Sequence, residues 1–396
     1  MSRTGERAAA SLTAAFLAPD RALLEHHLPG LDGQLAAVDL GTLERPGSPA
    51  VDLFRGSGAP ALFVPEEYSG LGVGLRDGVR IQRAIGSRAP SLAVASTMHH
   101  FSVASLTGWD SQEGGMEWLI AEAVARHSML VASGAAEARP GSGILNPAMS
   151  ARPVAGGVLV SGSKKPCSLS RSMDLLFATL RVGTPDGERC AVAVIPADSP
   201  GLSCRPFWRS DILAGAQSDE LVLDDVFVPG RLVSDVGPVG TTTDALRRSM
   251  VWFELLIAAS YVGMAAALVE RAVRAPRTDT RRLADLAVGL EAATYALEGV
   301  AARSDADAEP ATLLGPALTV RFAAQDAVLD VAATAADALG GGAFITSPDV
   351  AYLCAAVRCL AFHPPSRTAA TDALVAHLRG ESVGMDPVER PGDGKP

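Results

Sequence analysis

The sequence has no excess of basic residues. Its 396 residues include 34 lysines and arginines against 44 aspartates and glutamates, which gives a formal net charge of −10. A protein that binds nucleic acid needs a basic surface to neutralise phosphates, and no basic run offsets the acidic balance here. The composition therefore argues against a nucleic-acid partner.

Cysteines are also few, and their spacing matches neither a disulfide framework nor a metal site. The five cysteines are odd in number and scattered, and Cys354 and Cys359 have no histidine or cysteine at metal-binding spacing. We expect reduced, mostly buried thiols and no metal. Such thiols are typical of a cytoplasmic protein.

No apolar run is long enough to span a membrane. The longest, Leu255 to Leu268, is shorter than the roughly 20 residues that a bilayer requires, and it lies between Glu254 and Glu270. The N-terminal segment has no apolar core typical of a secretion signal. We therefore expect a core helix at Leu255–Leu268, no secretion signal and no membrane contact.

Hydrophobic periodicity divides the chain into three segments. Residues 1–130 and 236–382 carry apolar residues at helical spacing, and the second segment is rich in alanine, as in an antiparallel four-helix bundle. Residues 131–235 contain short strand patterns with turn signals, typical of a small antiparallel β domain. Residues 383–396 are predicted to be disordered. The expected fold class is α+β: an N-terminal helical domain, a middle antiparallel β domain and a C-terminal four-helix bundle.

Four motifs near the junctions of these segments narrow the fold. They are VPEEYSGLGVG (64–74), GSKKPCS (162–168), SDELVLDDVFVP (218–229) and ALGGGAF (338–344). Each resembles a motif of the acyl-CoA dehydrogenases, and the four follow that family's order and spacing over nearly the whole chain. The resemblance implies the acyl-CoA dehydrogenase fold, a bound flavin, and a homodimer or homotetramer. It also implies a substrate thioester carried by CoA or by an acyl carrier protein.

The resemblance also implies where the flavin ring binds. In the family, a threonine or serine at the end of the GSKKPCS motif hydrogen-bonds flavin N5; here it is Ser168, with Cys167 beside it. A hydroxyl suits this task because it donates or accepts. In the segment AEARPGSG, Gly141 and Ser142 match a family segment that contacts the flavin. The tryptophan that lies against the flavin in many members is replaced by Pro166.

Contacts to the dinucleotide half of FAD are less complete. The family's Arg-x-x-Phe-Gly and the glutamine after it are missing from a shortened segment, and Asp337 replaces the glutamine before the glycine turn. An acid close to a pyrophosphate repels it. Gly340 and Gly341 remain, and their backbone N–H groups can meet a phosphate. We expect FAD, with FMN as the alternative.

The catalytic glutamate of the family is missing. In most members it follows the last-domain glycines, where this chain has His363 in CLAFHPPSR. A second group has it on the first bundle helix, where this chain has Phe253, with Glu254 in place of the next residue, an arginine. Histidine titrates near neutrality and can act as base or hydrogen-bond donor. Glu254 needs a local shift of the helix, because one residue is 100° of rotation.

Three functions stay open at this point. The first is an acyl-CoA dehydrogenase-type flavin oxidoreductase that acts on the CH–CH group of an acyl thioester in a biosynthetic pathway. The second is a two-component monooxygenase of the same fold that uses reduced FMN, since His363 also resembles those enzymes. The third is a non-redox protein or lyase that binds acyl thioesters and has lost the catalytic glutamate.

Overall fold

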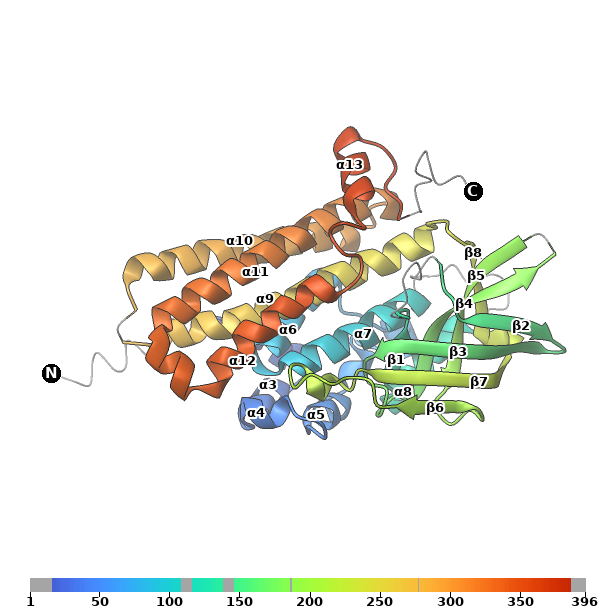
Figure 1. Cartoon of the computed structure of the whole chain (residues 1–396), viewed down its shortest axis with the longest axis horizontal. Helices are drawn as coiled ribbons and strands as arrows, with labels where there is room; N and C mark the ends of the chain where they lie inside the picture. Colours follow the sequence, from blue (N-terminus) through green and yellow to red (C-terminus); the bar gives the residue numbers. More distant parts are fainter. Residues whose placement is uncertain (1–15, 108–115, 138–145, 186, 277, 386–396) are drawn as a thin grey trace, which may run out of the picture.

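The chain forms an N-terminal group of helices, a β domain and a long helical bundle (Figure 1). The computed structural model describes residues 16–107, 116–137, 146–185, 187–276 and 278–385, and the structural statements below concern these residues. The first strand begins at Val131, the last strand ends at Pro238, and the first bundle helix begins at Asp244. The exact domain limits remain a prediction, and residues 386–396 of the predicted tail lie outside the described part.

The N-terminal helices pack around α7, which is buried along nearly its whole length because apolar residues surround it on all sides. The VPEEYSGLGVG motif forms a tight loop beside them, and a Cβ on Gly70 would lie 1.9 Å from the carbonyl oxygen of Val64. The loop therefore needs a glycine there. The elements are α2 (Ala18–His27), α3 (Leu31–Ala36), α4 (Leu40–Leu43), α5 (Ala50–Gly56), η1 (Ala59–Ala61), η2 (Glu66–Tyr68), α6 (Leu75–Arg88), α7 (Pro90–Thr107) and α8 (Glu117–His127).

The β domain is one sheet of eight strands in the order β6-β7-β3-β2-β4-β5-β8, with β1 paired to β4. Most pairs are antiparallel, as expected, but β4 pairs in parallel with both β1 and β2. Parallel strands cannot be joined by a tight hairpin. Longer connections therefore lead from β1 and from β2 to β4, which runs in the same direction as both strands. The strands are β1 (Val131–Gly134), β2 (Ser150–Val154), β3 (Gly157–Cys167), β4 (Leu175–Thr184), β5 (Gly187–Pro196), β6 (Leu202–Arg205), β7 (Asp219–Pro229) and β8 (Val233–Pro238), with η3 (Ala214–Ala216) and η4 (Gly230–Leu232) in the connections.

The bundle has three long helices, and shorter elements take the place of the expected fourth. Gly340, with φ 80° and ψ 163°, breaks α11 near its C-terminal end. The chain then turns back through α12 and η5 along α9 (Figure 1). The elements are α9 (Asp244–Arg274), α10 (Thr280–Asp305), α11 (Pro310–Thr346), α12 (Pro348–Ala356), η5 (Val357–Phe362) and α13 (Thr371–Arg379).

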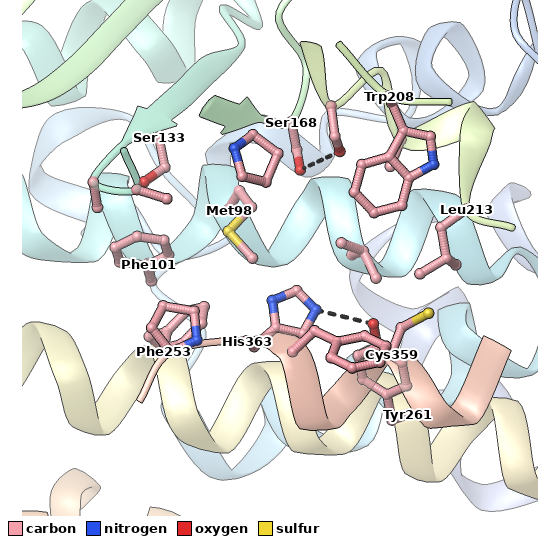
Figure 2. Close-up of a pocket in the computed structure, with 18 of the residues that line it drawn as sticks. Met98, Phe101, Ser133, Ser168, Trp208, Leu213, Phe253, Tyr261, Cys359 and His363 are labelled. Carbon is pink, nitrogen blue, oxygen red and sulfur yellow. Dashed lines mark hydrogen bonds between the residues drawn. The ribbon is translucent and has the colours of Figure 1, made fainter. Parts of the chain in front are cut away.

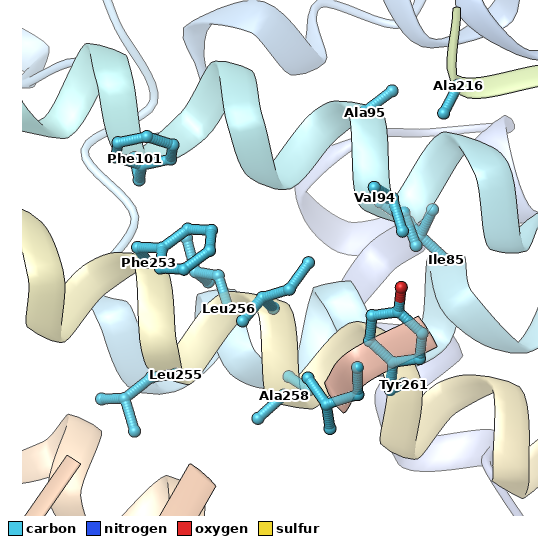
Figure 3. Close-up of a cluster of buried hydrophobic side chains, with 14 of the residues drawn as sticks. Ile85, Val94, Ala95, Phe101, Ala216, Phe253, Leu255, Leu256, Ala258 and Tyr261 are labelled. Carbon is cyan, nitrogen blue, oxygen red and sulfur yellow. The ribbon is translucent and has the colours of Figure 1, made fainter. Parts of the chain in front are cut away.

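Helix α9 is the centre of the molecule. Its most apolar stretch would be long enough to cross a membrane by length and composition, but 94% of that stretch is buried inside the protein, as in a core helix. It approaches α6 closely because both helices have a glycine at the crossing: a Cβ on Gly86 would lie 2.2 Å from the Ser260 carbonyl oxygen. On the side of α7, Phe253 of α9 faces Phe101, with ring centroids 5.3 Å apart (Figure 3). This packing fixes the face of α9 that the functional site uses.

Candidate functional site

A cavity of about 610 Å³ lies between the β domain and the helices (Figure 2). Its walls come from distant parts of the chain: α7, β1 and the residues after it, the end of β3, the loop before β7, α9, and the turn after η5. Such a largely apolar space with a few convergent polar groups is the usual form of a ligand site. The lining residues are Val94, Met98, Phe101, Ser133, Ala135, Ala136, Glu137, Pro166, Ser168, Trp208, Leu213, Ala216, Ser218, Phe253, Tyr261, Cys359, Phe362, His363 and Pro364.

Two serine hydroxyls lie on the β-domain wall of this cavity. Ser168, predicted to meet flavin N5, hydrogen-bonds Ser218 at 3.0 Å between the two Oγ atoms. The backbone here is held in an uncommon conformation, since Leu169 and Gln217 both have positive φ, 63° and 56°. Leu169 N–H donates to the Ala216 carbonyl oxygen at 3.0 Å, which ties the two loops together. Strained backbone of this kind gathers where a site fixes the direction of a side chain.

A buried ion pair closes the same wall behind the serines. Lys164 donates to Glu137, and the Glu137 carboxylate also accepts the backbone N–H groups of Ala148 and Met149 at 2.6 and 3.0 Å. Burial by itself would raise the pKa of Glu137, but Lys164 and the two N–H groups lower it overall. Lys164 of the GSKKPCS motif therefore neutralises the Glu137 carboxylate, which lines the cavity.

His363 lies on the opposite side of the cavity, as the resemblance implied for the catalytic position. Its Nε2 atom is 2.9 Å from the hydroxyl oxygen of Tyr261, and Figure 2 shows its second ring nitrogen turned away from Tyr261. Burial and the nearby positive charge of Arg321 lower the pKa of His363 to about 3. The imidazole is therefore neutral at physiological pH. The cis-linked Pro364-Pro365 pair follows it and ends the helical turn of η5.

Glu254 does not line this cavity. It lies on α9 next to Phe253, whose ring does face the cavity, and the Glu254 carboxylate instead approaches Arg321, with 3.3 Å between Oε2 and Nε. Both side chains are fully buried. Since adjacent helical residues differ by 100°, no local shift has brought Glu254 round to the site. A base role for Glu254 is not supported by this position.

Arg321 connects that ion pair to the histidine turn. Its Nη2 atom donates to the carbonyl oxygens of Leu360 and His363, each at 2.9 Å. Burial raises the pKa of Glu254 to about 8, and Arg321 opposes that shift. The pair therefore holds the backbone of His363 in place from behind the cavity wall.

The other predicted flavin residues are not all brought to the cavity. Cys167 precedes Ser168, but its thiol is buried in the core, and burial raises its pKa to about 12. Gly340 and Gly341 lie at the end of α11, where the bundle turns into α12 far from the β domain (Figure 1). Gly141 and Ser142 lie outside the described residues. Their flavin roles remain predictions.

Several cavity residues had no signal in the sequence. Trp208 projects into the cavity from the loop before β7, and its indole N–H donates to the Ile212 carbonyl oxygen at 2.9 Å, which fixes the ring. Ser133 lines the cavity because β1 pairs in parallel with β4. No pattern in the sequence predicts that pairing. Tyr261 occurs within a run of apolar residues that reads simply as core. The one feature that could have pointed to Tyr261 is its polar hydroxyl within an otherwise apolar run.

The cavity suits a flavin ring. Its β-domain wall offers hydroxyl groups from Ser168 and Ser218, which can pair with ring nitrogens and oxygens, and the fixed indole of Trp208 offers an aromatic contact. Trp208 thereby supplies the aromatic neighbour that Pro166 removes from the motif. Together with the apolar side chains of α7 and α9, these residues would hold a flavin that carries the redox chemistry.

The chain is similar to several known proteins along most of its length. No family model matches the sequence. The chain is 44% identical over 361 residues to isobutylamine N-hydroxylase of Streptomyces viridifaciens, across 89% of this chain and 95% of that protein. It is 24% identical to a mitochondrial isovaleryl-CoA dehydrogenase of Oryza sativa subsp. japonica, across 72% of this chain and 71% of that protein. KijD3, solved in complex with FMN and a dTDP-linked amino sugar, superposes with a TM-score of 0.80 at 22% identity, covering 94% of this chain and 95% of that chain.

These likenesses support a flavin-dependent redox enzyme among the functions left open. The non-redox alternative receives no support, because the relatives are redox enzymes by name. The histidine cavity, the serine pair and the 44% identity over nearly the full length point the same way. The chain belongs to the acyl-CoA dehydrogenase superfamily, in the family of isobutylamine N-hydroxylase, and is a flavin-dependent oxidoreductase.

Proposed function

We propose that this enzyme hydroxylates the nitrogen of a small aliphatic primary amine, using dioxygen and reduced FMN supplied by a separate reductase. The observation that carries the proposal is the neutral His363, bound to Tyr261, in the place where the dehydrogenases have a carboxylate base. The relative that is 44% identical over most of its length is an amine N-hydroxylase by name.

Dehydrogenation of an acyl thioester does not fit this site. That reaction needs a base whose pKa approaches that of the activated α-carbon. His363, with its pKa lowered to about 3, is far too weak a base. Glu254 lines a small adjoining pocket and not the cavity itself, and its carboxyl group lies against Arg321. Glu137 is engaged by Lys164 and two backbone N–H groups. No other described lining residue carries a carboxylate.

Oxygenation of an amine makes no such demand, because the amine brings its own lone pair. Reduced FMN, held in the cavity by the residues described above, would supply the two electrons that dioxygen needs. In the balanced reaction one amine, one dioxygen and one reduced FMN give one hydroxylamine, one oxidised FMN and one water. The chain's residues bind and orient the amine, exclude bulk water and hold His363 ready as a hydrogen-bonding group over the cavity.

FMN is proposed as the flavin because the sequence lacks several contacts to the dinucleotide half of FAD, with Asp337 in place of a glutamine before the glycine turn. KijD3, whose fold is similar, was solved with FMN.

The direct test is turnover with a flavin reductase, NADH and dioxygen, offered isobutylamine and an acyl-CoA such as isobutyryl-CoA in parallel. The proposal expects N-isobutylhydroxylamine and an unchanged thioester. Desaturation of the thioester, without a product from the amine, would overturn it. Parallel reactions with FMN and with FAD at equal concentration decide the flavin, and clearly faster product formation with FAD would refute FMN.

A further inference from the structure

The ionisable side chains that line the cavity are all neutral or already paired. Among the described lining residues these are Glu137, Tyr261, Cys359 and His363. Glu137 is paired with Lys164. Burial lowers the pKa of His363 and raises the pKa values of Tyr261 and Cys359, so each of these three is uncharged at physiological pH.

The charged groups behind the walls are paired as well. On the helical side, Glu254 of α9 faces Arg321 of α11, and both side chains are fully buried. On the β-domain side, Lys164 of β3 also donates to Thr179 of β4 at 3.1 Å, which completes its contacts with Glu137. On the β-domain side, therefore, the charges of Glu137 and Lys164 cancel. On the helical side burial raises the pKa of Glu254 to about 8, so near neutral pH this carboxyl is largely protonated and the nearby charge is the positive one of Arg321.

An alkylammonium ion would lose its hydration in this cavity, and the described lining residues would offer it no unpaired anion. Burial of an unpaired charge is strongly unfavourable, so such a group enters uncharged instead. The remaining wall is uncharged. Met98, Phe101 and Phe253 face the space (Figure 2), and the polar groups among the other described lining residues are the hydroxyls of Ser133, Ser168 and Ser218 and the indole of Trp208. A second amine or a carboxylate on the substrate would meet no unpaired partner among the described side chains.

We propose that the cavity binds its amine as the uncharged free base and selects monoamines whose other groups are apolar. The inference rests on the proposed function, which it deepens by naming the bound form of the substrate. Binding the free base also delivers the reactive form, since an ammonium has no lone pair to be oxygenated. With a pKa close to that of a lysine side chain, only about one alkylamine molecule in a thousand is a free base near pH 7.4.

The test is calorimetric titration of the enzyme loaded with oxidised FMN, without turnover, at several pH values. The apparent Kd of isobutylamine should fall by about tenfold for each pH unit between roughly pH 7 and pH 9, as the free base accumulates. The matched probes are ethylamine and 2,2,2-trifluoroethylamine, whose fluorines lower the amine pKa below neutrality. Ethylamine should follow isobutylamine, whereas the fluorinated amine should bind with a pH-independent Kd. A pH-independent Kd for isobutylamine would overturn the inference.

Substitutions of Ser133 test the same inference by changing the charge of the cavity wall. Ser133 is buried, and its side chain faces the cavity (Figure 2). Ser133→Asp places a carboxylate in the cavity and should flatten the pH dependence of isobutylamine binding, while Ser133→Asn, of equal size, should keep it. A Ser133→Asn variant that flattens the profile as much as Ser133→Asp would count against the charge argument. The wild-type titration with the two ethylamines decides the matter even if Ser133→Asp fails to fold.

Failure of the inference and of the proposed function give different results. Isobutylamine that binds with the expected pH dependence but yields no hydroxylamine would refute the function and leave the free-base inference standing. Hydroxylamine formation together with pH-independent binding would do the reverse. Absence of alkylamine binding at every pH would overturn the inference itself.

Discussion

The Nε2 atom of His363 lies 2.9 Å from the hydroxyl oxygen of Tyr261, although 102 residues separate the two in the chain. Among the described residues, this buried hydroxyl has no other hydrogen-bond partner. A buried hydroxyl proton without an acceptor is costly, so Tyr261 donates to Nε2 and the imidazole keeps its proton on Nδ1. His363 then presents an N–H donor on the side of its ring that faces away from Tyr261.

Tyr261→Phe should therefore reduce the coupling of flavin oxidation to product. Loss of one neutral hydrogen bond, worth about 1 kcal/mol, leaves the His363 ring free to turn and to change tautomer. We expect several-fold less hydroxylamine per reduced FMN consumed, with hydrogen peroxide making up the difference. Both products are measured in the same reaction. Tyr295→Phe, at an exposed tyrosine, is the control and should behave as wild type; equal coupling in the two variants would contradict this role of Tyr261.

Arg321→Met should destabilise the protein strongly. Above about pH 8, where Glu254 is ionised, it strands the buried carboxylate, and it also frees the two carbonyl oxygens of the histidine turn. Removing one partner of a buried ion pair costs about 3–5 kcal/mol, and replacing both partners recovers part of that loss. Urea unfolding of Arg321→Met and of Arg321→Met with Glu254→Leu measures both effects. Arg126→Met, in an exposed pair with Glu122, should lower the free energy of unfolding by less than about 1 kcal/mol. An equal loss of stability in Arg126→Met and in Arg321→Met would contradict the prediction.

The pH dependence of stability should contain a contribution from His363. Its pKa is lowered to about 3 in the folded state from 6.5, because burial penalises the charged ring. Between these values the unfolded chain binds a proton that the folded chain does not, so stability falls as pH falls. One such group contributes up to about 1.4 kcal/mol per pH unit. His363→Asn should show a shallower loss between about pH 6.5 and pH 4, while His127→Asn, at an exposed histidine, keeps the wild-type slope.

Trp208 should contribute to flavin affinity. Its indole is fixed by the hydrogen bond to Ile212 and lies on the cavity wall beside the serine pair. Loss of an aromatic contact of about 0.5–1.5 kcal/mol should raise the Kd for oxidised FMN by about two- to tenfold in Trp208→Ala. Trp208→Phe keeps a ring and should lose less. Titration followed by flavin fluorescence measures both, and an unchanged Kd in Trp208→Ala would show that the ring binds elsewhere.

The bundle should associate with further copies of the chain. The most apolar stretch of α11 is only 22% buried, and Ile345 near its end is 83% exposed. We propose that this surface is covered in a homodimer or homotetramer. Light scattering should give a multiple of the chain mass of 40.7 kDa, and Ile345→Glu should weaken the association. A monomer mass for the wild-type protein would contradict the proposal.

The sequence was sufficient for the fold and for the position of His363, because both rest on local motifs that keep their order along the chain. It was not sufficient for the direction of side chains on α9. There, one residue of register separates Phe253 on the cavity wall from Glu254 against Arg321. It also missed Tyr261 and Trp208, since an aromatic residue within an apolar run or an irregular loop has no pattern that marks it as part of a site. These contacts arise only when distant segments pack together.

A single-turnover experiment tests most directly whether an amine nitrogen receives one atom of dioxygen. The enzyme, loaded with reduced FMN in the absence of oxygen, is mixed with isobutylamine and heavy-isotope dioxygen, and the products are analysed by mass spectrometry. The expected product is N-isobutylhydroxylamine that carries one heavy oxygen atom. Isobutylamine recovered unchanged, with all of the heavy oxygen in hydrogen peroxide, would contradict the proposed function.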